Sequence, residues 1–175
     1  MSPRIHQPPR TEGSVELWID VPARQLYDMV ADVTRINERS PECRSCAWLP
    51  GLSPGTVGAR FRGRNRAHHM RWSRVCEVAA ADPGRKFEFH TVSDRRNPLY
   101  HDSTTWSYTF SADGDGTRVT HSYRIDVPPY RPLLALYARL QPQHRDMRPQ
   151  MRQNLEALRR QAHAGTHAGS LPRTA

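Results

Sequence analysis

The sequence predicts an α+β fold in which an antiparallel sheet curves around one closing helix. Two features of the element order predict it. A short amphipathic helix at 21–32 precedes a train of strand-like segments over 44–127, and one long amphipathic helix at 148–163 ends the train. A sheet packed around a terminal helix often leaves a cavity between the two, so this order indicates a pocket for a small molecule.

The chain of 175 residues has the length of one domain. Residues 1–13 are rich in Pro and Arg, and residues 164–175 are small, polar and without a hydrophobic pattern, so both are expected to be disordered tails. The single domain is therefore expected over 14–163, which is long enough to bury a core around a cavity.

The strand-like segments show the period of two that half-buried strands have. They are expected at 14–20, 47–49, 59–67, 70–80, 86–92, 104–110 and 117–127, with a polar loop over 93–100. None of the later connections needs a helical crossover, so the sheet should be antiparallel. Further short helices are expected up to Arg39 and over 131–140, before Pro142.

Two of these elements have an informative face. In the strand 59–67, four arginines alternate with small or apolar residues, so the arginine face should meet solvent. The opposite face, with Phe61 and Asn65, has little bulk, as a cavity wall would. In the last helix, Met151 and Leu155 belong to an apolar stripe that should face the sheet.

The net charge of +9 raises the question of a nucleic-acid partner. Lys86 is the only lysine and the arginines are scattered along the chain, which favours biased codon usage over a binding surface. We therefore expect no nucleic-acid partner. No apolar run has the length of a membrane span, and the N-terminus has no apolar core of a secretory signal. The expected location is the cytoplasm, without stable membrane insertion.

The spacing Cys43-x-x-Cys46 occurs in zinc and redox motifs. No second pair of this kind follows, and Cys46 lies at the start of a predicted strand rather than of a helix, so two ordinary free thiols are the better interpretation. His68 and His69 are adjacent on a predicted strand end and should point to opposite faces. We expect neither a metal nor a cofactor.

Seven short motifs, taken in order, resemble one known group of proteins. They are Val21-Pro22-Ala23, Val30-Ala31-Asp32, Ser40-Pro41, the segment 58–66, Asp82-Pro83-Gly84-Arg85, Thr105-Trp106-Ser107-Tyr108 and Gly116-Thr117-Arg118-Val119-Thr120. The chain in this respect resembles the START/Bet v 1-like (SRPBCC) helix-grip superfamily, and within it the polyketide cyclase/dehydrase family. The resemblance implies a seven-stranded antiparallel sheet around a long C-terminal helix, two short N-terminal helices and a deep hydrophobic cavity. Members bind lipids, polyketides or other apolar ligands, and fold alone does not decide which.

Three polar side chains on otherwise apolar strand faces are the candidate catalytic residues. Arg74 shares its face with Trp72 and Cys76, and would either bind an anionic or carbonyl group of a ligand or reach solvent from an offset strand. His121 suits acid–base work at neutral pH, but a histidine on an apolar face is also commonly a core residue. Tyr123, next on the same face, could donate a proton or pack.

The candidate ligand-binding residues are polar or aromatic groups on the same faces. Asn65 could bond a ligand carbonyl or a neighbouring strand, and the aromatic side chains suit a flat ligand, although alternating aromatic residues also build cores. These candidates are Phe61, Asn65, Trp72, Phe89, Trp106, Tyr108, Tyr137, Met151 and Leu155.

These features predict a domain that binds a hydrophobic small molecule. The resemblance implies that this molecule is aromatic or polyketide-like and that the protein is a cofactor-independent polyketide cyclase/dehydratase of secondary metabolism. The pocket would fold the substrate, Arg74 or Asn65 would polarise a carbonyl, and His121 or Tyr123 would carry a proton. The alternative is a non-enzymatic binding protein, or a lipid-transfer protein whose arginine face meets anionic lipid. A homodimer is left open.

Overall fold

The computed structural model describes residues 9–168 except 131–132, 134–135 and 137–138. Most of the helix predicted at 131–140, together with the candidate ligand-binding residue Tyr137, therefore lies outside the described residues. None of the described helices is long and apolar enough to cross a membrane.

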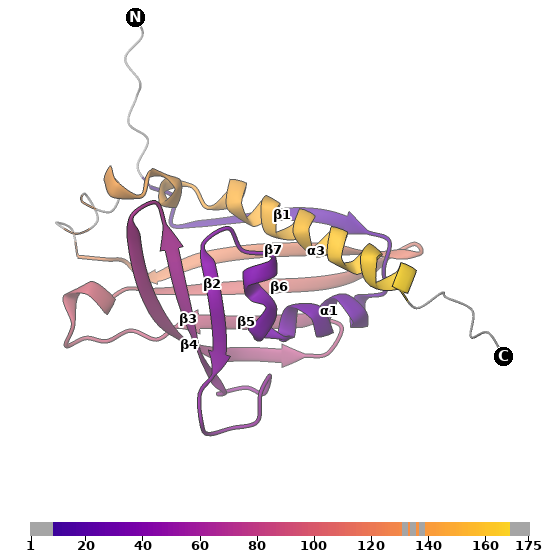
Figure 1. Ribbon diagram of the computed structural model, residues 1–175, viewed down its shortest axis with the longest axis horizontal. Coiled ribbons are helices and arrows are strands. Elements are labelled where there is room, and N and C mark those ends of the chain that lie inside the picture. The colour runs from indigo at the N-terminus through magenta and orange to yellow at the C-terminus, as the bar shows by residue number, and fades with distance from the viewer. Residues whose placement is uncertain (1–8, 131–132, 134–135, 137–138, 169–175) are drawn as a thin grey trace, which may run out of the picture.

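One antiparallel sheet forms the body of the molecule (Figure 1). Its seven strands lie in the order β1-β7-β6-β5-β4-β3-β2, so that each strand from β2 to β6 pairs with the next one in the chain, and β7 also pairs with β1. The strands are β1 (Glu12–Ile19), β2 (Cys43–Trp48), β3 (Arg60–Ala67), β4 (Met70–Asp82), β5 (Lys86–Thr91), β6 (Ser103–Asp113) and β7 (Gly116–Val127). The predicted antiparallel sheet and its seven strands are confirmed.

The helices lie on one side of this sheet. Figure 1 shows α3 (Arg148–Ala168) running along the sheet on the same side as α1 (Ala23–Ala31). The helix α3 packs against β1 and β7, and α1 packs against β5 and β6. Short 3-10 helices are η1 (Val33–Glu38), η2 (Pro98–Tyr100) and η3 (Pro142–Arg145). This is the helix-grip arrangement that the sequence predicted.

Local chemistry explains where the helices begin. Pro22 occupies the cap position of α1, where its missing N–H costs nothing, and the helix buries Leu26, Tyr27 and Val30 against the sheet. The Asp32 carboxylate accepts the backbone N–H of Thr34 and so starts η1.

Several element bounds differ from those predicted. The strand β2 starts at Cys43 rather than at residue 47, because a register shift between Cys43 and Ser45 interrupts the alternation by which strands are recognised. The strand β1 begins at Glu12, where it pairs with Arg124, and α3 extends beyond 163 to Ala168. Pairing and helix propagation thus extend regular structure into segments whose composition predicted tails.

The inner face of the sheet has two different halves. Under α1, Tyr27 packs edge-on against Phe87 and Phe110, with ring centroids 6.1 and 6.0 Å apart, and this half is solid. Buried apolar side chains of α3, including Leu155 and Leu158, continue this core. Toward the β3–β4 turn the core gives way to a cavity.

Candidate functional site

A cavity of about 620 Å³ lies between α3 and the inner face of β2–β7. This volume is in the range of pockets that enclose small organic ligands. Exposed Leu99, Leu136 and Leu140, together with Met70 and Arg71, border one end of the cavity, which we call the open end.

Most of the candidate residues border this cavity. They are Phe61, Asn65, Trp72, Arg74, Phe89, Trp106, Tyr108, His121 and Met151. The strand faces that were predicted from alternation to point inward therefore do line the cavity. The four arginines of β3, Arg60, Arg62, Arg64 and Arg66, are all exposed on the outer face, as the sequence predicted.

Two candidates do not border the cavity. Leu155, only 1% exposed, belongs to the solid core, because the cavity-facing side of α3 carries Gln150, Met151 and Asn154 instead. Tyr123 is covered from the side of β1: Gly13 lies so close that a Cβ there would be 2.9 Å from the ring, and the Tyr123 hydroxyl donates to the Arg10 carbonyl (3.3 Å). The geometry therefore gives Tyr123 a packing role.

Arg74 borders the cavity but is neither free nor in solvent. Its Nη1 donates to Asp102 Oδ1 at 2.7 Å, its Nη2 donates to the Asp102 carbonyl at 2.6 Å, and its side chain is 12% exposed. The guanidinium also lies 5.6 Å from the Tyr100 ring centroid. Both interpretations made from the sequence missed this partner, which neutralises the charge of Arg74 and ties β4 to the start of β6.

His121 is buried against the cavity floor. It stacks on Tyr108, with ring centroids 3.9 Å apart and an interplanar angle of 8°, and its Nδ1 lies 3.2 Å from the Ser107 carbonyl. Since a carbonyl only accepts, Nδ1 carries the proton and donates to it. Burial lowers the pKa of His121 to about 4, so the ring stays neutral at physiological pH.

Tyr108 lies next to three polar side chains, those of His121, Arg39 and Asn154. We call these four residues the floor cluster. Burial raises the pKa of Tyr108 to about 12, and its hydroxyl is hydrogen-bonded with Asn154. The Asn154 amide, in the orientation that satisfies both of its ends, donates to the Arg39 carbonyl at 2.9 Å. Tyr108 therefore remains a neutral phenol.

The Arg39 guanidinium is the unusual member of the floor cluster. It borders the cavity, and burial lowers its pKa. Among the described residues no carboxylate lies within ion-pair distance of it. A mostly desolvated cation without a counter-ion is costly, so Arg39 is suited to an electron-rich oxygen of a ligand.

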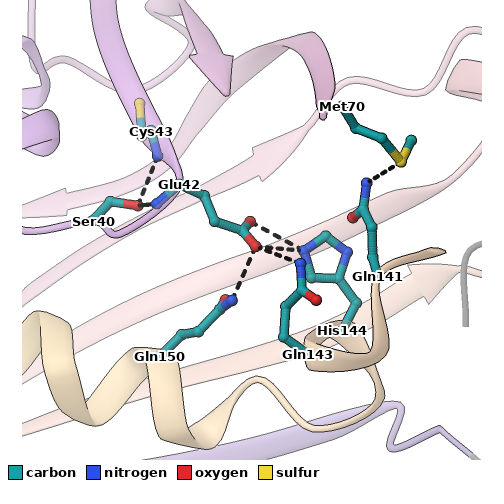
Figure 2. A network of polar contacts seen from close by, with 8 residues as sticks. All are labelled: Ser40, Glu42, Cys43, Met70, Gln141, Gln143, His144 and Gln150. Atoms are coloured by element: carbon teal, nitrogen blue, oxygen red, sulfur yellow. Dashed lines mark hydrogen bonds and ion pairs between the residues drawn. The ribbon is translucent and has the colours of Figure 1, made fainter. Parts of the chain in front are cut away.

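A second polar cluster lies nearer the open end and is drawn in Figure 2. The Glu42 carboxylate, just before β2, accepts from Gln143 Nε2 (3.2 Å), from Gln150 Nε2 (2.9 Å) and from His144 Nε2, which lies 3.1 and 3.0 Å from its two oxygens. Desolvation alone would raise the pKa of Glu42, but the hydrogen bonds from these neighbours outweigh it and the pKa is lowered. Glu42 is therefore ionised at neutral pH.

The three cysteines are free thiols, and all three border the cavity. The bulge in β2 turns Cys43 and Cys46 to the same face, with their sulfurs 3.4 Å apart. Opposite them is Gly63, where a Cβ would lie 3.4 Å from Cys46 Sγ, so a side chain there would press on this wall. Among the described residues, no three His, Cys, Asp or Glu side chains converge in a way that could hold a metal ion.

Comparison with known families agrees with this geometry. A family model described as "Polyketide cyclase / dehydrase and lipid transport" matches residues 10–163, which is most of the chain. The chain belongs to this family. The resemblance stated from seven short motifs is confirmed by this match.

Solved structures show the same fold at low sequence identity. A Polyketide_cyc-like protein, Cgl2372 from Corynebacterium glutamicum, is 24% identical, with a TM-score of 0.60 over 95% of this chain and 100% of that one. TTHA0849 from Thermus thermophilus is 17% identical (TM-score 0.66; 88% and 98% covered). The di-domain ARO/CYC StfQ from the steffimycin biosynthetic pathway is 13% identical, with a TM-score of 0.68 over 90% of this chain and 52% of that one. A search of curated proteins found no match.

Sequence reasoning missed four polar residues of the site, and three of them carry no signal in the sequence. Arg39 and Glu42 lie in the irregular segment between η1 and β2, and Asp102 precedes β6 in a loop, so no periodicity marks them. Asn154 was detectable, because it lies three positions after Met151 on the same helical face. A polar residue on that apolar face is the signal that would have found it.

Proposed function

We propose that this chain binds a flat, apolar molecule of aromatic or polyketide-like chemistry in its cavity, and that it acts on it as a cofactor-independent cyclase or dehydratase in the cytoplasm. The observation that carries the proposal is the cavity of about 620 Å³, with aromatic walls and a small number of polar groups on its floor. Trp72, Phe89 and Trp106 provide flat apolar surface for such a ligand.

The floor cluster supports the chemical part of the proposal. Ring closure of a poly-β-ketone requires that a carbonyl oxygen be polarised as an adjacent carbon becomes an enolate. The neutral Tyr108 phenol can turn its one proton from Asn154 to that oxygen, and the Arg39 guanidinium, free of a carboxylate among the described residues, can balance the developing charge. This assigns to Arg39 and Tyr108 the role that the sequence suggested for Arg74 or Asn65.

Native mass spectrometry of the purified protein tests the binding step. The expected spectrum has a small-molecule adduct that is lost on denaturation and reduced in Trp106→Ala. This substitution removes wall surface, including a ring 5.8 Å from that of His121, but removes no hydrogen bond of the floor cluster. The proposal fails if the protein carries no adduct and also fails to bind N-phenyl-1-naphthylamine, a neutral, flat aromatic probe.

The alternative is a carrier that binds and releases without reaction, in agreement with the lipid transport named in the family description. The exposed arginines of β3 would then meet anionic lipid, with Arg60 already engaged by Glu77 (2.7 Å). A carrier predicts that Tyr108→Phe changes only affinity, whereas an enzyme predicts lost turnover of the co-purified compound with binding retained. Binding to phosphatidylserine vesicles that does not depend on salt would rule out the hypothesis that the β3 arginines bind a lipid surface.

A further inference from the structure

The cluster around Glu42 contains a histidine whose orientation is fixed by a carboxylate. His144 Nε2 lies 3.0 and 3.1 Å from the two Glu42 oxygens, and the same carboxylate accepts from Gln143, beside His144, and from Gln150 on another side (Figure 2). We propose that His144, oriented by Glu42, is the base that takes a proton from the molecule bound in the cavity. This inference rests on the proposed function and names the group that performs its proton transfer.

The hydrogen bonds determine which ring nitrogen is free. Glu42 is ionised and can only accept, so whenever the His144 ring carries a single proton, that proton lies on Nε2. Its Nδ1 then has a lone pair, and no hydrogen bond to Nδ1 is formed within the described part of the chain. Figure 2 shows Nδ1 on the side of the ring away from Glu42. The ring is thus arranged as a base whose opposite nitrogen is already bonded to an anion.

The ring also lies where a ligand would be. His144 borders the cavity and packs edge-on against Trp72, with ring centroids 6.0 Å apart and an interplanar angle of 79°. A flat molecule lying against Trp72 is therefore adjacent to the His144 ring. The side chain of His144 is 31% exposed, so the ring has access to water and can exchange its proton.

Spacing along α3 relates this base to the floor cluster. Gln150 bonds to Glu42, and Asn154, four residues further along, bonds to the Arg39 carbonyl. Four residues of α-helix rise about 6 Å, so the two clusters follow one another along one wall of the cavity. One small ring system in the cavity can therefore contact both clusters. Its carbonyl oxygen lies at Arg39 and Tyr108, and an acidic C–H beside that carbonyl lies near His144.

The step balances without a cofactor. Nδ1 accepts the proton of a C–H next to the polarised carbonyl, the carbon keeps the electron pair, and the resulting enolate oxygen is stabilised by Arg39 and Tyr108. The imidazolium so formed is paired with the Glu42 carboxylate. In a dehydration the same proton leaves on the departing hydroxyl as water, and His144 returns to its neutral form.

His121 is poorly suited to this role, although it is the histidine that strand alternation identified. Its Nδ1 donates to the Ser107 carbonyl, its ring is stacked on Tyr108, and burial lowers its pKa to about 4. A weak base without a nearby carboxylate forms its cation at high cost. His144 has the partner that His121 lacks.

The Kemp elimination of 5-nitrobenzisoxazole tests the assignment without knowledge of the natural substrate. In this flat aromatic probe, removal of the C3 proton by a base makes a nitrile as the N–O bond breaks, and the product is a coloured phenolate. We expect kcat to fall about 100-fold in His144→Gln, as for loss of a general base. His69→Gln, on the exposed turn between β3 and β4, is the matched control and should react as the wild type.

Two further variants separate a catalytic from a structural role. Imidazole added to His144→Ala should restore part of the rate, which a purely structural histidine would not allow. Glu42→Gln, a positioning change, should lower kcat about tenfold and leave KM unchanged, because the base keeps its place but loses the anion that stabilises its cation.

Binding of N-phenyl-1-naphthylamine, measured on the same variants, distinguishes the two levels of the proposal. If the wild type neither carries a small-molecule adduct nor binds this probe, the proposed function fails and the assignment of His144 fails with it. If probe binding is intact, two results overturn the assignment of His144 alone. One is an equal rate of Kemp elimination in wild type, His144→Gln and Glu42→Gln, and the other is a wild-type rate no higher than that of buffer.

Discussion

Phe87 and Phe89 lie two residues apart on β5, point to the same face, and belong to different halves of the molecule. Phe87 is fully buried and packs under α1 against Tyr27, whereas Phe89 packs against Phe61 (ring centroids 5.2 Å apart) and borders the cavity. The same residue type on one strand thus stabilises the fold at one position and forms a binding wall at the other. The two positions differ in what lies against the ring. Phe87 is packed under α1, whereas Phe89 faces the cavity.

The largest predicted effect tests this difference between the halves. Phe87→Ala should lower the free energy of unfolding by about 4 kcal/mol, because it opens a new hole in close-packed surroundings. Phe89→Ala, its matched control, should cost less than about 2 kcal/mol, since it enlarges a space that already exists. Denaturant titrations of both variants measure the difference, and equal losses would mean that the two halves are not distinct.

The second prediction concerns pH and the buried floor of the cavity. The folded pKa of His121 is about 4 and the unfolded value about 6.5, so between these pH values the unfolded chain binds more protons. Stability should therefore fall as the pH drops from 7 to 4, by about 3 kcal/mol from this one residue. His121→Phe should flatten the pH dependence of stability in this window, and an unchanged slope would contradict the neutral, buried ring.

The third prediction probes the wall that carries Arg74. Asp102→Asn leaves a mostly buried guanidinium without its carboxylate and should cost about 2 kcal/mol of unfolding free energy. Asp113→Asn, at an exposed pair with Arg118, is the matched control and should cost less than about 1 kcal/mol. Equal effects in thermal or denaturant unfolding would show that Arg74 does not depend on its partner.

The fourth prediction concerns recognition by the floor cluster. Arg39→Met should weaken binding of anilinonaphthalene sulfonate about tenfold, which is about 1.4 kcal/mol, and leave N-phenyl-1-naphthylamine nearly unaffected. The two probes differ only by the sulfonate, so the comparison isolates the charge of Arg39. A parallel loss for both would show that Arg39 merely packs.

The comparison of the two phenylalanines also shows how far sequence reasoning reaches. Alternation in β3 and β5 placed Phe61 and Phe89 on the inner face correctly, because side-chain direction in a strand is a local property. Which residues of that face border empty space depends on where α1 and α3 cover the sheet, and no local pattern states that.

The polar groups show the same limit more strongly. The partner of Arg74 is 28 positions away in a loop, and His144 is 102 positions from Glu42. Both pairs form only when the whole sheet has closed, so residue types and spacing could not reveal them. The bulge in β2, which turns Cys43 and Cys46 to one face, hid that strand's start for a different reason, since it breaks the period of two.

The central claim is that the hollow half of the molecule is a site for a flat apolar ligand, and one titration tests it most directly. N-phenyl-1-naphthylamine fluorescence, followed in wild type and Trp106→Ala, should show saturable one-to-one binding that the substitution weakens about tenfold through lost apolar contact. Absence of saturable binding to the wild type, or identical affinities for the two proteins, would contradict the account.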